Sequence, residues 1–178
     1  MTDELRILLG TQTYSRADVA YHIGVLKEFL EYLFFTEHVS SPNPDIIASF
    51  AQKKEYEEQD IFFLERLPES FFKVFSQESF YKKLEQFADE AKKLPTLSLV
   101  VPVVLKSKQI SEIGTWARTE IRENILLDID VDPTISVGCQ IVWNDILYDF
   151  GLNRQIKNHQ TEIENTVHNF MPALDNGK

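Results

Sequence analysis

The sequence predicts an α+β protein in which an all-α helical bundle precedes a small α/β domain of the order strand, helix, strands, helix. Two observations predict this fold. Up to Leu94 the apolar residues recur every three or four positions, which is the spacing of one helix face. After Pro95 they run together or alternate with acids, which is typical of strands. We therefore expect a domain at residues 1–94 and a second domain at residues 95–178.

Helical spacing in the first half covers residues 18–35, 46–50, 61–67 and 80–94. A cluster of turn-forming residues at 40–44 separates the first two of these segments. Five phenylalanines stand at helical spacing in the later segments: Phe62, Phe63, Phe71, Phe72 and Phe75. They could line a groove for a partner, but aromatic residues at this spacing more often form a core, which is what we expect here.

The second half begins with a β-branched run at 97–104, which predicts a strand with an edge or a kink at Pro102. Residues 110–121 return to helical spacing, with Ser107 or Ser111 available as an N-cap. Alternation at 127–131 predicts a further strand, and segments 137–143 and 146–150 flank Asn144-Asp145 as in a hairpin. A last helix is expected from apolar residues at the following positions: Leu152, Ile156, Ile163, Val167 and Phe170.

Composition narrows the class of protein. Hydrophobic residues make up 43% and charged residues 26% of the 178 residues, which predicts a folded core and not a disordered chain. The formal net charge is −10 and the basic pairs are dispersed among acids, so we expect no nucleic-acid partner. Cys139 is the only cysteine, so no disulfide can form within the chain.

The N-terminal residues resemble neither a signal peptide nor a transit peptide, because acids follow Met1 directly. No apolar run approaches the roughly 20 residues that span a bilayer. We therefore expect no direct membrane insertion and attachment to a membrane only through partners.

Residues from Leu126 onward read LLDIDVDPTISVGCQIVWNDILYDFGLNRQI. This stretch resembles the C-terminal signature of the delta (OSCP-type) subunit of F-type ATP synthases. In register with that pattern stand Asp132-Pro133, Gly138, Asn144-Asp145 and Asp149, while Val137 replaces the first glycine of a pair. Upstream, Val101-Pro102-Val103 resembles the strand that opens the family's C-terminal domain, so the similar stretch covers residues 95–156.

The resemblance implies a non-catalytic stator component that links the catalytic head of the synthase to its peripheral stalk. It implies two partners, the N-terminal helix of an alpha subunit for the helical half and the b-subunit stalk for the other half. It also implies a cytoplasmic location at the membrane through the complex, and no cofactor. The motif positions Asp132, Pro133, Gly138 and Asp149 are expected to be structural. Gly138 would then need a positive φ or a close backbone approach, and Asp149 would cap the last helix.

Alternative functions are also open, and one of them rests on a different set of residues. Asp128, Asp130 and Asp132 share one face of a strand and could hold calcium or magnesium, which would suit a small metal-binding enzyme, although a solvated strand face is the simpler interpretation. The E-type stalk subunit of archaeal and vacuolar ATPases has a similar acidic strand, and a free-standing regulatory adaptor is a third alternative. We expect Cys139 to be a buried, inert thiol. The four histidines lack metal-binding spacing and are expected at the surface: His22, His38, His159 and His168.

Overall fold

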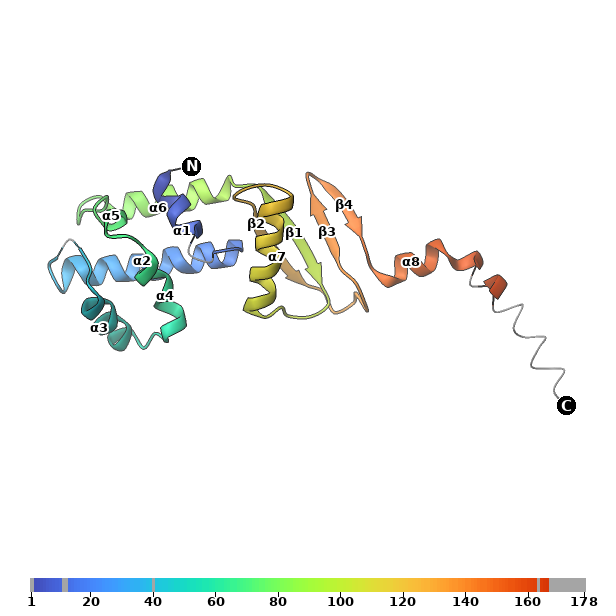
Figure 1. Ribbon diagram of the computed structural model, residues 1–178, viewed down its shortest axis with the longest axis horizontal. Helices are drawn as coiled ribbons and strands as arrows, with labels where there is room; N and C mark the ends of the chain where they lie inside the picture. Colours follow the sequence, from blue (N-terminus) through green and yellow to red (C-terminus); the bar gives the residue numbers. More distant parts are fainter. Residues whose placement is uncertain (1, 11–12, 40, 163, 167–178) are drawn as a thin grey trace. The chain divides into compact units, whose positions relative to one another are not determined.

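The structure is a computed structural model that describes residues 2–10, 13–39, 41–162 and 164–166. The α+β class is confirmed, because helices make up most of the N-terminal half and a four-stranded mixed sheet lies in the C-terminal half (Figure 1). The chain forms two compact units. Unit 1 holds Met1–Thr96 and Lys106–Asp128, and unit 2 holds Leu97–Leu105 and Ile129–Lys178.

Unit 1 contains the labelled helices α1 to α7, and α8 belongs to unit 2. Their bounds are α1 Asp3–Gly10, α2 Arg16–Phe35, α3 Pro44–Lys54, α4 Glu58–Arg66, α5 Glu69–Phe72, α6 Phe80–Lys92 and α7 Ser107–Glu120. The long helices α2 and α6 lie side by side (Figure 1). The sequence did not predict α1, whose leucines are buried. The helix now labelled α7 was predicted as part of the second domain, after Pro95, but it belongs to unit 1.

Side-chain caps explain where two helices begin. The hydroxyl of Ser15 accepts a hydrogen bond from the Asp18 backbone N–H, and the Asp18 carboxylate accepts one from the Ser15 N–H. This capping box starts α2 two residues before the predicted position. The side chain of Asn43 likewise accepts from the Ile46 N–H at 2.9 Å, with Pro44 as the first residue of α3.

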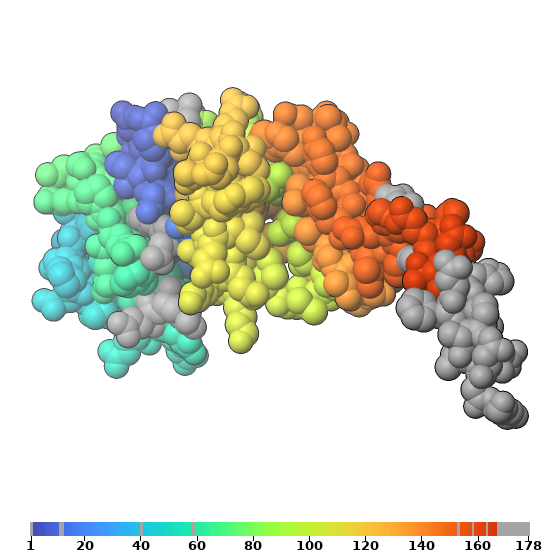
Figure 2. Space-filling model, turned by 45° about the vertical axis from the view of Figure 1, so that its right-hand side comes forward, coloured from blue at the N-terminus to red at the C-terminus, as the bar shows by residue number. Residues whose placement is uncertain are grey.

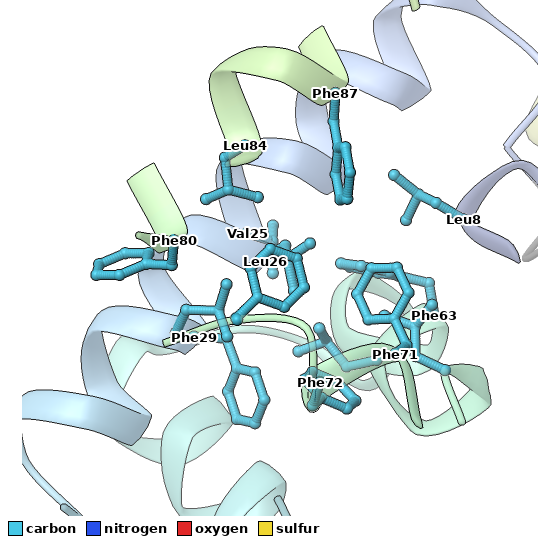
Figure 3. Close-up of a cluster of buried hydrophobic side chains, with 14 of the residues drawn as sticks. Leu8, Val25, Leu26, Phe29, Phe63, Phe71, Phe72, Phe80, Leu84 and Phe87 are labelled. Carbon is cyan, nitrogen blue, oxygen red and sulfur yellow. The ribbon is translucent and has the colours of Figure 1, made fainter. Parts of the chain in front are cut away.

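A phenylalanine-rich core fills unit 1 (Figure 3). The ring of Phe29 lies edge-on to Phe50 at 5.2 Å and to Phe72 at 5.8 Å between centroids, the geometry that aromatic pairs prefer. Of the five phenylalanines predicted to be core, four are buried, namely Phe63, Phe71, Phe72 and Phe75. The prediction is wrong for Phe62, which is 41% exposed beneath the guanidinium of Arg66.

The sheet has the order β2-β1-β3-β4. Its strands are β1 Thr96–Val101, β2 Leu126–Val131, β3 Gln140–Trp143 and β4 Ile146–Asp149, and β3 is antiparallel to both β1 and β4. The first strand is shorter than predicted. It ends directly before Pro102, which has no N–H to donate, and Val103 and Val104 beyond it are exposed.

The predicted hairpin is confirmed. Trp143 pairs with Ile146 across the turn, and Asn144 and Asp145 have φ angles of 50° and 62°, as a type I′ turn requires. The strand before this turn begins only at Gln140, three residues later than predicted.

The last labelled helix is α8, Leu152–Asn158. Leu152 and Ile156 belong to it, whereas Ile163, Val167 and Phe170 of the predicted helix lie outside the described residues. Within the described part of the chain, no helix combines the length and the apolar character needed to cross a membrane.

Candidate docking surfaces

Gly138 lies where the backbone before β3 meets the backbone after β4. The N–H of Phe150 donates to the Cys139 carbonyl and the N–H of Leu152 donates to the Val137 carbonyl, both at 2.9 Å. Gly138 between them has a φ of 103°, and a Cβ atom there would stand 2.3 Å from the Phe150 carbonyl oxygen. Both backbone features that the sequence offered as alternatives, positive φ and close approach, are therefore present at this glycine.

Asp149 and Asp132 each stabilise a turn of unit 2. The Asp149 carboxylate accepts the N–H of Gly151, the N-cap of α8, at 2.8 Å, so it acts one step before the helix. The Asp132 carboxylate accepts the hydroxyl of Thr134 at 2.7 Å and the Thr134 N–H at 2.9 Å. These bonds, the hydroxyl first, lower the pKa of Asp132. Pro133 lies between Asp132 and Thr134 in that turn, Gly138 lies in the bend before β3, and Asp149 is the last residue of β4.

Asp128 and Asp130 lie on β2, but the prediction that Asp132 shares this strand is wrong, because β2 ends at Val131, and the three aspartates have separate partners. Asp128 lies 3.8 Å from the Arg16 guanidinium, Asp130 accepts from the N–H of its neighbour Val131, and Asp132 bonds Thr134. Among the described residues, no three histidine, cysteine, aspartate or glutamate side chains gather in a way that could hold a metal ion.

Unit 2 presents one apolar face of its sheet. Leu99 pairs with Ile141 and Ile141 pairs with Tyr148, and directly opposed residues project from the same face. Alternation along the strands completes this apolar sheet face, which consists of Leu97, Leu99, Val101, Ile141, Trp143, Ile146 and Tyr148.

Burial of the apolar sheet face falls from one strand to the next. The three β1 residues are buried, Ile141 and Trp143 on β3 are half-buried, and Ile146 and Tyr148 on β4 are 54% and 43% exposed. We call the last four residues the open half of this face. On the opposite face Leu147 is exposed as well, so three consecutive apolar residues of β4 meet solvent.

The chain that follows β4 adds to this exposed apolar surface. Phe150, Leu152 and Ile156 are each more than 40% exposed, and Leu152 and Ile156 are four residues apart on one face of α8. In Figure 2 the hairpin belongs to the orange surface, and the chain turns from orange to red along α8. Exposed apolar side chains gathered within a short stretch of chain favour an interaction site.

Unit 1 has a hollow of about 210 Å³ against α2 and α6. Its walls are mainly apolar and include small alanines, and the residues that line it are Arg16, Val19, Ala20, Ile23, Ala88, Ala91, Lys92 and Leu126. Two of these residues are cations, although the chain as a whole is acidic. The hollow is therefore suited to an apolar side chain that stands near a carboxylate.

His22 is half-buried, less exposed than the prediction of a surface histidine suggested. Its ring stacks on Phe63 with centroids 4.1 Å apart, and its Nδ1 lies 2.8 Å from the Thr13 hydroxyl. The Thr13 hydroxyl donates its one proton to the Leu8 carbonyl at 3.0 Å, so toward His22 its oxygen can only accept. Nδ1 of His22 therefore carries a proton and donates it to this oxygen. Burial lowers the pKa of His22, and the Asp18 carboxylate partly opposes this shift.

The other predicted side chains have simpler surroundings. His38 and His159 are exposed as expected, and His159 contacts Glu162 at 3.0 Å. His168 lies outside the described residues. Cys139 is half-buried and not buried, because β3 is less covered than its apolar sequence suggests.

Arg118 of α7 is a structural residue that the sequence did not reveal. Its guanidinium donates to the backbone carbonyls of Leu9, Thr13 and Ile125, and it lies over the ring of Tyr14 with its central carbon 4.8 Å from the centroid. Burial lowers the pKa of Arg118. The contacts to Leu9 and Thr13 join residues more than a hundred positions apart, and no local pattern predicts them.

A scan against protein-family models finds no match to this sequence, and a search of curated proteins finds none either.

Proposed function

We propose that this chain is a non-catalytic stator component of a rotary F-type ATP synthase that links the catalytic head to the peripheral stalk. The open half of the apolar sheet face, together with the exposed side of α8, is the observation that carries the proposal. Several exposed apolar side chains on one strand and one helix favour a protein partner. The motif residues from Asp132 to Asp149 support the choice of family, because each has a backbone or turn contact next to the strands that carry this surface.

In this proposal the protein works mechanically. Unit 1 receives the N-terminal helix of an alpha subunit, and helix docking uses apolar anchors of the kind that line the hollow beside α2 and α6. Unit 2 receives the end of the b-subunit stalk on its exposed apolar surface. Holding both partners lets the stalk resist rotation of the head, so that rotor torque drives synthesis.

The test is binding of the full chain to two synthetic peptides, one from an alpha-subunit N-terminus and one from the end of a b-subunit stalk. We expect both peptides to bind at the same time. Tyr148→Lys should weaken the b peptide alone, because it places a charge on the open half. Ala20→Glu should weaken the alpha peptide alone, because Ala20 lines the hollow and is exposed enough to accept a longer side chain.

Val104→Lys is the matched control. Val104 is 80% exposed and belongs to neither surface, so this variant should bind both peptides as the unmodified chain does. Failure of both peptides to bind the folded chain would refute the stator assignment. Loss of both peptides in each variant would show that the surfaces are misplaced.

A further inference from the structure

β4 is the edge strand of the sheet formed by the described strands. Trp143 pairs with Ile146, Ile141 pairs with Tyr148, and the Phe150 N–H donates to the Cys139 carbonyl. Hydrogen-bonded and non-hydrogen-bonded pairs alternate in an antiparallel ladder. The alternate residues, Leu147 and Asp149, therefore direct their backbone N–H and C=O groups away from β3.

Among the described residues this edge lacks lysine, proline and a bulge, although β4 is short, with four residues. Natural sheets protect their edges with lysine, proline, bulges or inward-pointing charges. Residues 144–150 contain neither lysine nor proline, β4 pairs with β3 without a bulge, and the central three residues are exposed and apolar. The edge therefore combines available backbone groups with side chains that favour an apolar neighbour.

The charged residues within positions 144–150 have one sign, and the nearest basic residue along the chain is Arg154, which lines a hollow together with Asp149. Asp145 precedes β4 and Asp149 ends it, and no basic residue occurs between positions 144 and 150. The whole chain carries a net charge of −10. A segment with lysine or arginine at its ends would complement this edge, whereas an acidic segment would be repelled.

We propose that β4 binds an extended segment of a partner protein by strand addition, and that this segment alternates apolar residues between flanking lysines or arginines. The inference rests on the proposed docking function, because it names a binding mode for the exposed surface of unit 2. The added strand bonds to Leu147 and Asp149, and every second side chain lies beside Ile146 and Tyr148. Main-chain bonds supply affinity and the alternate side chains supply specificity.

The experiment uses the full chain and a short synthetic peptide in which valine alternates with threonine between terminal lysines. Its first control has the same sequence with N-methyl groups on the amides that would face β4, and its second has glutamate in place of lysine. We expect the lysine peptide to bind and each control to bind at least about tenfold more weakly, a loss of roughly 1.4 kcal/mol. Hydrogen exchange should slow at the amides of Leu147 and Asp149 on binding and stay unchanged at Ile146 and Tyr148.

Two variants test the edge itself. Leu147→Pro removes an outward N–H that β3 does not use, and we expect about a tenfold loss of peptide affinity. Leu147→Thr keeps this N–H and should retain binding. Asp145→Asn suits the positive φ at this position and should reduce affinity for the lysine peptide at low salt. If Leu147→Pro does not fold, the exchange measurement on the unmodified chain decides the matter.

Three results would overturn the inference. They are no binding of the lysine peptide, equal binding of the N-methylated peptide, or slowed exchange that avoids Leu147 and Asp149. A chain that binds the alpha and b peptides but not the strand peptide keeps the proposed function and loses this binding mode. If the chain binds only the strand peptide, strand addition at β4 is supported and the stator function is refuted.

Discussion

Gly138 and Gly24 differ in whether their backbone conformation and surroundings require a glycine. Gly138 has a φ of 103° and faces the Phe150 carbonyl, a conformation and a spacing that a side chain cannot share. Gly24 is inside α2, and a Cβ atom there would have no heavy atom within 4 Å. The first glycine is required by the fold, whereas the second only weakens its helix.

We expect Gly138→Val to cost about 1–3 kcal/mol of folding free energy, the range for a strained backbone position. Gly24→Ala is the matched control and should stabilise the chain by about 0.5–1 kcal/mol, because alanine favours the helix. Chemical denaturation of both variants measures the two effects. A folded Gly138→Val chain of unchanged stability that loses the b peptide would instead place Gly138 in the interface.

His22 makes the stability of unit 1 depend on pH. Its pKa in the folded chain is lowered, so between that value and 6.5, the ordinary value, the unfolded chain binds more protons than the folded chain. The contribution of His22 to the free energy of unfolding should therefore reach its full value above pH 6.5. It should be lost as the pH falls from 6.5 through the lowered pKa. Urea denaturation at several pH values measures this.

His22→Gln removes the titrating group at this position and is the control for that series. The variant should show a weaker dependence on pH between neutral and mildly acidic conditions. An unchanged pH dependence would mean that other groups are responsible.

Residue patterns predicted some of these features and missed others. The backbone requirement at Gly138 was expected from the resemblance to a family motif, whereas the carbonyl that it faces, Phe150, is twelve positions away in the chain. The surroundings of His22 could not be predicted, since Thr13 and Phe63 reach it from other parts of the fold. The three consecutive apolar residues of β4 were visible in the sequence, but their exposure depends on which strand is at the edge.

At the scale of elements, the hairpin was predictable because its turn chemistry is local. Asn144-Asp145 between two apolar segments predicted the turn, and both residues have the positive φ of type I′. Boundaries were less accurate. Pro102 shortens β1, and the bend at Gly138 delays the start of β3, which are effects of single residues on strand pairing.

Glycine is favoured over aspartate at the second position of this turn. We therefore expect Asp145→Gly to stabilise unit 2 by up to about 1 kcal/mol, because Asp145 has a φ of 62°, in the left-handed region where a Cβ atom carries a steric cost. Thermal unfolding of the full chain measures the change. Asp145→Val, which is β-branched, should be destabilising, and equal stability of the two variants would contradict the turn assignment.

At the scale of the whole molecule, unit 1 does not end where the helical sequence pattern ends. Arg118 of α7 bonds the carbonyl of Leu9 near the end of α1 and that of Thr13 in the α1–α2 connection. The backbone of Leu127 also donates to the Tyr14 carbonyl at 2.9 Å. The predicted boundary at Pro95 would separate these partners.

We expect a fragment of residues 1–94 to be less stable than a fragment of residues 1–128, because the shorter one leaves the Leu9 and Thr13 carbonyls without their Arg118 donors. In the full chain, Arg118→Met should cost about 1–3 kcal/mol for the same reason. Denaturant unfolding tests both statements. Equal stability of the two fragments would support a self-sufficient domain at residues 1–94.

The two tryptophans fall one in each unit. Trp116 lies on α7 in unit 1 and is 51% exposed, and Trp143 lies half-buried on β3 in unit 2. Each unit thus carries its own fluorophore. Trp116→Phe leaves the emission of Trp143 to report the melting of unit 2, and Trp143→Phe leaves Trp116 to report unit 1. Whether the units unfold in one step or two can therefore be read from intrinsic fluorescence without any added label.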